Sequence, residues 1–160
     1  MDDKITHNDA LGKAKMVNVS HKPVTDRIAI ASGKILMKDV TLEMVKANAL
    51  AKGDVLGTAK VAGVMAAKKT SELIPMSHMI PLSGCEIDFE YLPYGILVVA
   101  TVQAQARTGV ELEALIAVNA ALMTIYDMAK SSDKEMVITD IKLLEKYGGK
   151  SGHFVRKDNI

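Results

Sequence analysis

Cysteine is almost absent from this sequence, which contains only Cys85. A single thiol excludes an intrachain disulfide and any metal site built from several thiolates, and it suits a reducing compartment. The opening residues MDDKITHNDA contain no apolar stretch typical of a signal peptide. The longest apolar runs fall short of the roughly 18 residues that a membrane span needs. We therefore expect a soluble, cytoplasmic protein with no membrane partner.

Aromatic residues and net charge are also scarce. The 160 residues include no tryptophan, 2 phenylalanines and 4 tyrosines, so Ala, Val, Ile, Leu and Met must form the core. The 10 methionines are therefore interpreted as packing residues. With 20 basic and 19 acidic residues, the formal net charge is only +1. Such a balance produces no long-range field for nucleic acid or a membrane surface, so any recognition of phosphate must be local.

The length and the periodicity of the sequence predict one domain. Residues 1–22 are polar without a sustained period, which predicts a mobile N-terminal arm before a single domain over 23–160. Strands are predicted at 27–37, 85–91, 96–106 and 136–146, and helices at 41–51, 54–73 and 107–130. This order is typical of an α+β, ferredoxin-like sandwich with helices on one face of an antiparallel sheet. The other face would be open, which favours an oligomer that covers it.

The predicted helix over 107–130 is apolar nearly all the way round, yet it carries charges. Glu113 and Asp127 lie on nearly the same face but roughly 21 Å apart along the axis, so one chain cannot bring them into one small site. Asp127 and Lys130 are three residues apart and within reach of each other. Their simplest interpretation is a surface ion pair. Because the flanking residues are apolar, we instead expect burial and proximity to tune this pair for acid and base work.

Three further clusters carry basic side chains, and each has a structural explanation as well. Lys52 stands at a helix junction, beside the expected cap Asp54. His78 ends the proline-framed loop IPMSH, downstream of Lys68 and Lys69, and the absence of a nearby second His or Cys argues against a metal site. The glycine-rich segment YGGKSG offers backbone N–H groups together with Lys146 and Lys150. It is not a P-loop, because no room remains for the helix that must follow.

Together these clusters contain lysines, acids, one histidine and glycine turns, which points to acid and base chemistry on a phosphorylated small molecule. A regulatory oligomer that binds a guanine nucleotide without consuming it remains an alternative, since fold alone does not decide function. An RNA-binding module of the same fold is disfavoured, because the central strands lack stacking aromatic residues and the chain is nearly neutral.

The runs KGDVLGTAKVAGVMAAKKTSELIPMSH, RTGVELEAL, TIYDMAK and YGGKSG together resemble the cyclic pyranopterin monophosphate synthase family, the molybdenum cofactor biosynthesis protein C. The resemblance extends from about Thr6 to Val155. It implies a ferredoxin-like subunit in a homo-hexamer, built as a trimer of dimers with active sites at subunit interfaces. It also implies a lyase that converts 3′,8-cyclo-7,8-dihydroguanosine 5′-triphosphate, supplied by a radical S-adenosylmethionine enzyme, into cyclic pyranopterin monophosphate and pyrophosphate.

The resemblance also implies functions for particular residues. Lys52, Asp127 and Lys130 match the family's catalytic residues. The residues expected to bind substrate or to offset its charge are Met76, Ser77, His78, Leu112, Glu113, Glu111, Lys22, Arg27, Lys68, Lys69, Lys146 and Lys150. The long helix would then contribute its two ends to different sites. No metal site and no tightly bound cofactor are expected, and the sequence leaves open whether Mg²⁺ accompanies the triphosphate.

The sequence departs from the family's pattern at four positions. The family commonly shows IPLCHP where Ser77 and Met79 stand, DMCK where Ala129 stands, and an aspartate at Asn18. A mechanism that needs a thiolate at position 77 or 129 could not operate here, and a role for the carboxylate at position 18 is in doubt. The matching acid, lysine and histidine positions are intact, so we expect activity to survive.

Overall fold

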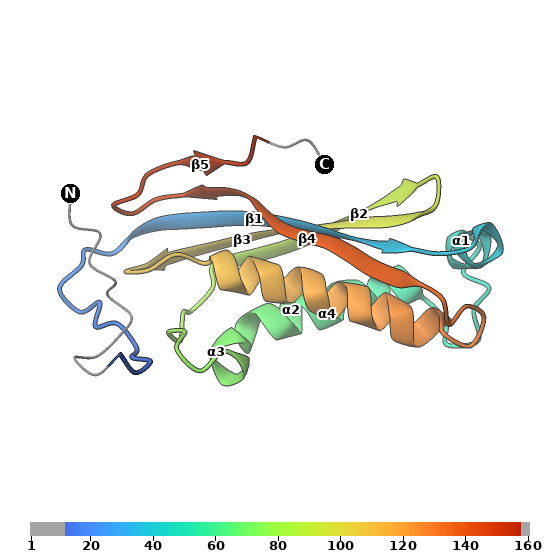
Figure 1. Cartoon of the computed structure of the whole chain (residues 1–160), viewed down its shortest axis with the longest axis horizontal. Helices are drawn as coiled ribbons and strands as arrows, with labels where there is room; N and C mark the ends of the chain where they lie inside the picture. The colour runs from blue at the N-terminus through green and yellow to red at the C-terminus, as the bar shows by residue number, and fades with distance from the viewer. Residues whose placement is uncertain (1–11, 158–160) are drawn as a thin grey trace.

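The computed structural model describes residues 12–157, which form an antiparallel sheet with helices packed on one face (Figure 1). The sheet has 5 strands in the order β2-β3-β1-β4-β5. The elements are β1 (Thr25–Leu36), α1 (Asp39–Lys46), α2 (Val55–Lys68), α3 (Thr70–Leu73), β2 (Gly84–Leu92), β3 (Gly95–Ala106), α4 (Glu111–Ala129), β4 (Val137–Tyr147) and β5 (Phe154–Val155). The predicted α+β, ferredoxin-like architecture is thereby confirmed.

Strand β1 is the centre of the sheet because it pairs along its whole length with β3 and on its other edge with β4. Small residues on its inner face, Ala29, Ala31 and Gly33, let the helices approach closely. A Cβ atom added at Gly33 would lie 2.8 Å from a methyl carbon of Leu122 and 2.9 Å from one of Val118, both on α4. Helix α4 therefore runs directly beneath β1.

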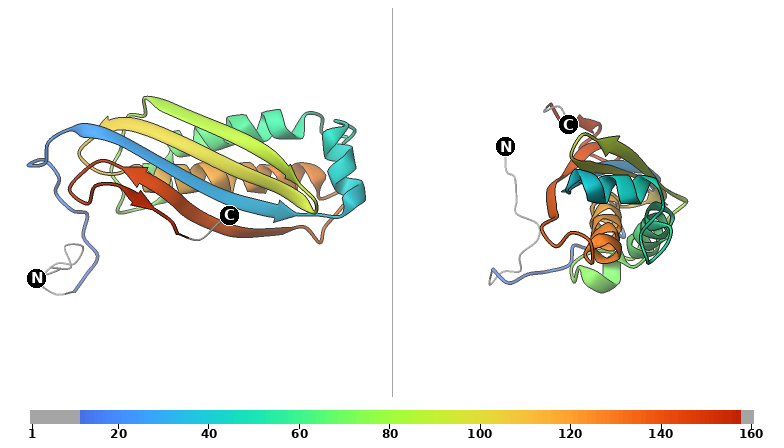
Figure 2. Two further views of the ribbon diagram at one scale, coloured as in Figure 1. Left: turned by 90° about the horizontal axis from the view of Figure 1, so that it is seen from above. Right: turned by 90° about the vertical axis from the view of Figure 1, so that its right-hand side faces the viewer.

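Helices α2 and α4 lie side by side under the sheet and run in opposite directions (Figure 2). Gly63 of α2 sits at their contact, where an added Cβ would lie 2.9 Å from the Ala117 carbonyl oxygen and 2.2 Å from Ile87 of β2. By length and composition α4 could cross a membrane, but half of its apolar window is buried inside the protein. Its apolar surface belongs to the core of this fold.

The helix boundaries differ from those predicted. Helix α1 ends at Lys46 rather than at residue 51, because Asn48 adopts a left-handed conformation with φ of 52°. The predicted helix over 54–73 breaks at Lys69 into α2 and α3. Helix α4 begins at Glu111, four positions after the predicted start at Arg107, with Val110 as its N-cap.

The short strand β5 was not predicted. It pairs with the end of β4, Glu145 with Val155 and Lys146 with Phe154. The chain reverses between them through Gly148 and Gly149, whose φ angles of 92° and 78° favour glycine. The glycine-rich segment is thus a tight turn between two strands.

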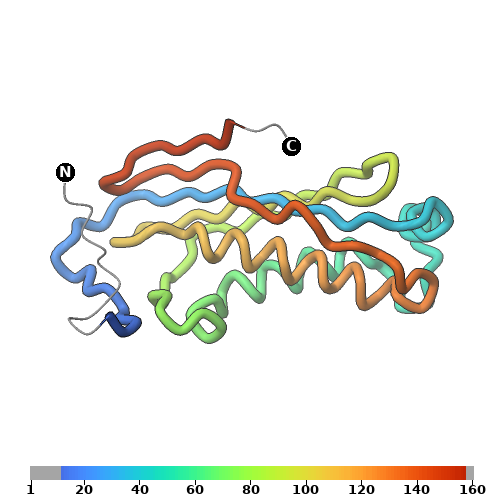
Figure 3. The backbone as a smooth tube through the Cα atoms, in the orientation of Figure 1, coloured from blue at the N-terminus to red at the C-terminus, as the bar shows by residue number. Residues whose placement is uncertain are grey.

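The predicted arm is only partly described, since residues 1–11 lie outside the described residues. Before the chain enters β1 at one end of the sheet (Figure 3), Val17 and Val19 line a cavity together with the loop after α3 and the first turn of α4. His78 contacts the arm through a hydrogen bond between its Nε2 and the Val17 carbonyl oxygen, at 2.7 Å. The mobility of the arm stays a prediction.

Candidate functional site

Asp127 joins two lysines at the C-terminal end of α4. Lys52 Nζ lies 2.6 Å from Asp127 Oδ2, and Lys130 Nζ lies 2.8 Å from Asp127 Oδ1. Lys52 Nζ also donates a hydrogen bond to the Asp127 main-chain carbonyl at 3.0 Å. Lys52 reaches this position from the loop before α2, where Gly53 adopts a φ of 87°. The two predicted catalytic segments therefore meet, although they are far apart in the sequence.

These contacts set the ionisation of the cluster. The hydrogen bond from Lys130, followed by that from Lys52, lowers the pKa of Asp127 from 3.8 to about 2. The same bond to Asp127 raises the pKa of Lys130. At neutral pH the aspartate is therefore ionised and Lys130 is protonated.

The prediction that burial tunes this pair was wrong. The Asp127 side chain is 53% exposed, whereas its neighbours Ile125 and Met128 turn into the core. Ile125 lies two positions before Asp127, about 200° round the helix, so it faces the core while Asp127 faces solvent. Proximity to Lys130 and Lys52, rather than burial, lowers the pKa.

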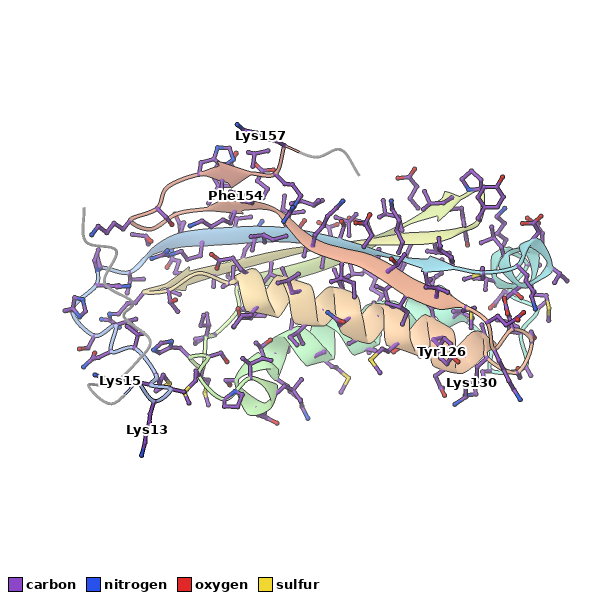
Figure 4. The ribbon with its side chains drawn as sticks, viewed as in Figure 1. Lys13, Lys15, Tyr126, Lys130, Phe154 and Lys157 are labelled. Atoms are coloured by element: carbon purple, nitrogen blue, oxygen red, sulfur yellow. The ribbon has the colours of Figure 1, made fainter. Side chains whose placement is uncertain are left out.

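A shallow cavity of about 340 Å³ adjoins the cluster, and we call it the Asp127 cavity. It is lined by Lys52, Tyr126, Asp127, Lys130, Ser131 and Lys134. Figure 4 shows Tyr126 and Lys130 at the same end of α4. Sequence reasoning missed Tyr126 and Lys134, because their positions suggested only a helix residue and a turn residue. The spacing of four residues between Lys130 and Lys134 was the one sequence feature that could have placed Lys134 near the cluster.

A second cavity, of about 270 Å³, lies at the N-terminal end of α4. It is lined by Val17, Val19, Lys22, Met76, Ser77, His78, Ile80, Thr108, Gly109, Leu112 and Glu113. Glu113 is only 3% exposed, and burial raises the pKa of its carboxyl. A carboxyl group held in this way can accept or donate hydrogen bonds to a polar ligand. We call this space the Glu113 cavity.

A basic cavity of about 540 Å³ shares Lys22, Thr108 and Gly109 with the Glu113 cavity, so the two adjoin. Its further lining residues are Arg27, Arg107, Glu111, Lys146, Lys150 and Ser151. Four of the basic residues predicted to contact the substrate thus line one space: Lys22, Arg27, Lys146 and Lys150. Their cationic groups suit the binding of phosphate.

The glycine turn and the end of β3 hold Arg27 in place. The Arg27 side chain is 8% exposed, and its Nε donates to the Ala106 carbonyl oxygen at 3.3 Å. A Cβ atom at Gly149 would lie 1.9 Å from Arg27 Nη1, so the turn packs directly on the guanidinium group. Lys146 contacts Glu111 at 4.0 Å and donates a hydrogen bond to Ser151. The basic cavity is therefore built from three separate segments of the chain.

Two lysines predicted to contact the substrate line neither the Glu113 cavity nor the basic cavity. Lys68 and Lys69 are exposed at the end of α2. Lys68 lies near Cys85, where its charge opposes the rise in thiol pKa that burial produces. A role for these two lysines in substrate binding stays a prediction.

The four departures from the family's pattern have different surroundings. Ala129 is fully buried in the core and does not line the Asp127 cavity, so a larger side chain there would meet the core. Ser77 lines the Glu113 cavity and donates to the Ile74 carbonyl oxygen at 3.0 Å. Met79 is 84% exposed, and Asn18 Oδ1 accepts a hydrogen bond from the Ser20 N–H.

The two groups of predicted site residues lie at opposite ends of α4. Glu113 stands in its first turn and Asp127 near its last, about 21 Å apart along the helix axis. Within one chain these predicted site residues therefore form two separate groups. Within residues 12–157, no group of three or more His, Cys, Asp or Glu side chains is arranged to hold a metal ion.

Comparisons with known proteins agree with these features. Residues 16–149 match the model of the MoaC family. The chain is 51% identical over 158 residues to a cyclic pyranopterin monophosphate synthase of Desulfitobacterium hafniense, covering 98% of this chain and 97% of that protein. It is 53% identical over 148 residues to the protein of that name from Novosphingobium aromaticivorans, covering 92% and 94% of the two chains. The chain belongs to the MoaC family.

Proposed function

We propose that this protein is a cyclic pyranopterin monophosphate synthase of molybdenum cofactor biosynthesis. It converts 3′,8-cyclo-7,8-dihydroguanosine 5′-triphosphate to cyclic pyranopterin monophosphate and releases pyrophosphate. The observation that carries this proposal is the contact of Lys52 and Lys130 with Asp127, in a chain of this family. Relatives that match nearly the whole chain bear the same name.

The ionisation of the Asp127 cluster supports acid and base catalysis. Asp127 is ionised and accepts hydrogen bonds from both lysines, so it orients two ammonium groups toward the cavity. Asp127 raises the pKa of Lys130, so this lysine stays protonated at neutral pH and is available as a proton donor. The lysines can donate protons during ring opening and rearrangement, and Asp127 can orient them or accept a proton that is returned.

The basic cavity supports the second part of the reaction. A sugar hydroxyl must attack the α-phosphorus while pyrophosphate leaves, so negative charge builds up on phosphate oxygens. Lys22, Arg27, Lys146 and Lys150 line one space where such oxygens can be held. Charge at these positions stabilises the leaving group without a covalent intermediate. Mg²⁺ bound to the triphosphate is compatible with this arrangement, and the described residues provide no acidic cluster for it.

A complete active site then requires two chains. One copy contributes the Glu113 cavity and the basic cavity, and another contributes the Asp127 cavity. The separation of the two ends of α4 supports this arrangement, as does the open face of the sheet. We propose a homo-hexamer located in the cytoplasm, which receives its substrate from a radical S-adenosylmethionine enzyme and binds neither nucleic acid nor a membrane.

Turnover of the purified cyclic dihydroguanosine triphosphate tests the proposal. Pyrophosphate release and pterin formation should occur with the wild type and fall by about 10²- to 10⁴-fold in Lys52→Ala and Asp127→Asn. Lys60→Ala, which removes an exposed lysine of α2, is the matched control and should retain turnover. Binding of the compound without turnover by the wild type would refute the synthase and favour a nucleotide-binding regulator.

A further inference from the structure

The Asp127 cavity contains more positive than negative charge. Three ammonium groups, from Lys52, Lys130 and Lys134, surround one carboxylate, that of Asp127. Lys52 and Lys130 both bind Asp127, so a single carboxylate already serves two lysines. The excess charge predicts that this cavity receives an anion.

Lys134 differs from the other two lysines because its ammonium group is not engaged. Within residues 12–157 the ammonium group of Lys134 has no hydrogen bond or ion pair, and the side chain is exposed. The two acidic residues next to Lys134 in the sequence pair with Lys38 instead. Glu135 and Asp133 lie 2.5 Å and 3.7 Å from Lys38 Nζ. The charge of Lys134 therefore remains available to a ligand.

The main chain that carries Lys134 is held in place on both sides. The Tyr126 hydroxyl donates a hydrogen bond to the Lys134 carbonyl oxygen at 3.3 Å. The carboxylate of Asp133, only 2% exposed, accepts hydrogen bonds from the N–H groups of Lys38 and Glu135, each at 3.0 Å. A fixed main chain reduces the entropy lost when the lysine binds a ligand.

We infer that Lys134 binds a phosphate oxygen of the substrate, and that Tyr126 positions it. The inference rests on the proposed function, which supplies a polyphosphate as substrate and pyrophosphate as product. An ammonium group recognises phosphate through charge-assisted hydrogen bonds. Lys134 lies beside the Lys52, Asp127 and Lys130 cluster, so this contact holds the phosphate chain at the catalytic end of the cavity.

Steady-state kinetics with Lys134→Gln and Lys134→Arg in the full-length protein tests this inference. Loss of the charge should raise KM about ten- to a hundredfold, with a much smaller fall in kcat, because a charge-assisted contact is lost. Lys134→Arg should recover most of the loss, and Lys60→Gln should resemble the wild type. An unchanged KM in Lys134→Gln would overturn the inference.

Calorimetric titration with inorganic pyrophosphate gives an answer that does not depend on turnover. Lys134→Gln should bind pyrophosphate about tenfold or more weakly than the wild type or Lys60→Gln does. Equal affinities, or no binding by the wild type, would overturn the inference. A wild type that binds pyrophosphate through Lys134 but does not turn over the substrate would refute the proposed function while the anion site stands.

Discussion

Lys52 holds Asp127 by two bonds, one to the carboxylate at 2.6 Å and one to the main-chain carbonyl at 3.0 Å, across a separation of 75 positions in the chain. The second bond ties Lys52 to the helix itself, where the last carbonyl groups lack partners within the helix and carry partial negative charge. The lysine therefore stabilises both the ionised aspartate and the end of α4. This double contact explains why a lysine from a loop has a defined place in the cluster.

Removal of Lys52 should raise the pKa of Asp127. In Lys52→Ala the hydrogen bond from Lys130 remains, so the pKa should move upward from about 2 without exceeding the ordinary 3.8. NMR titration of the Asp127 carboxyl carbon measures this pKa directly in the variant and in the wild type. Lys46→Ala breaks an exposed pair with Glu43 and should leave Asp127 unchanged. An Asp127 pKa in Lys52→Ala equal to that of the wild type would show that Lys52 does not stabilise the carboxylate.

Activity should be restored when two inactive variants are mixed. If each active site combines the Glu113 end of one chain with the Asp127 end of another, Glu113→Gln and Lys52→Ala damage different halves. Random reassembly of equal amounts should then recover about a quarter of wild-type activity. The measurement is turnover after co-refolding, with Asp127→Asn plus Lys52→Ala as the control pair that cannot complement. Recovery no greater than in that control would argue against a shared site.

The buried carboxyl of Glu113 should make stability depend on pH in a particular direction. Burial raises its pKa above 4.5, so the unfolded chain loses this proton first and stability declines as pH rises through the folded pKa. Glu113→Gln removes the decline. Its melting temperature relative to wild type should therefore increase from about pH 4 to about pH 8. Glu90→Gln changes an exposed carboxyl on β2, and its difference from wild type should stay flat.

Gly63→Ala should destabilise the fold even though alanine favours helices. The new methyl group would clash with Ile87 and with the Ala117 carbonyl, at distances of 2.2 Å and 2.9 Å. Overpacking typically costs about 1–3 kcal/mol, and the gain in helix propensity offsets up to about 1 kcal/mol of it. Urea denaturation measures the resulting change in the free energy of unfolding. Gly84→Ala meets only ordinary contacts of 3.6 Å or more and should unfold like the wild type.

The fold was predictable because the hydrophobic pattern has a clear period in most of its elements. Strands β1 to β4 and helix α4 lie where alternation and helical spacing placed them, with small shifts at the ends. The early end of α1 at Lys46, ahead of the left-handed Asn48, and the break at Lys69 depend on backbone conformations that no pattern marks. Strand β5 has only two residues, too few to show a period.

The sequence by itself predicted which side chains carry the chemistry, and it determined that Glu113 and Asp127 are too far apart to share one site in one chain. The helical rise alone dictates that separation. Only the tertiary structure decided that Lys52 reaches Asp127, that Asp127 is exposed rather than buried, and that Tyr126 and Lys134 complete its cavity. These relationships depend on how α2, α4 and the turn before β4 pack, and contacts between distant segments leave no local signal in the chain.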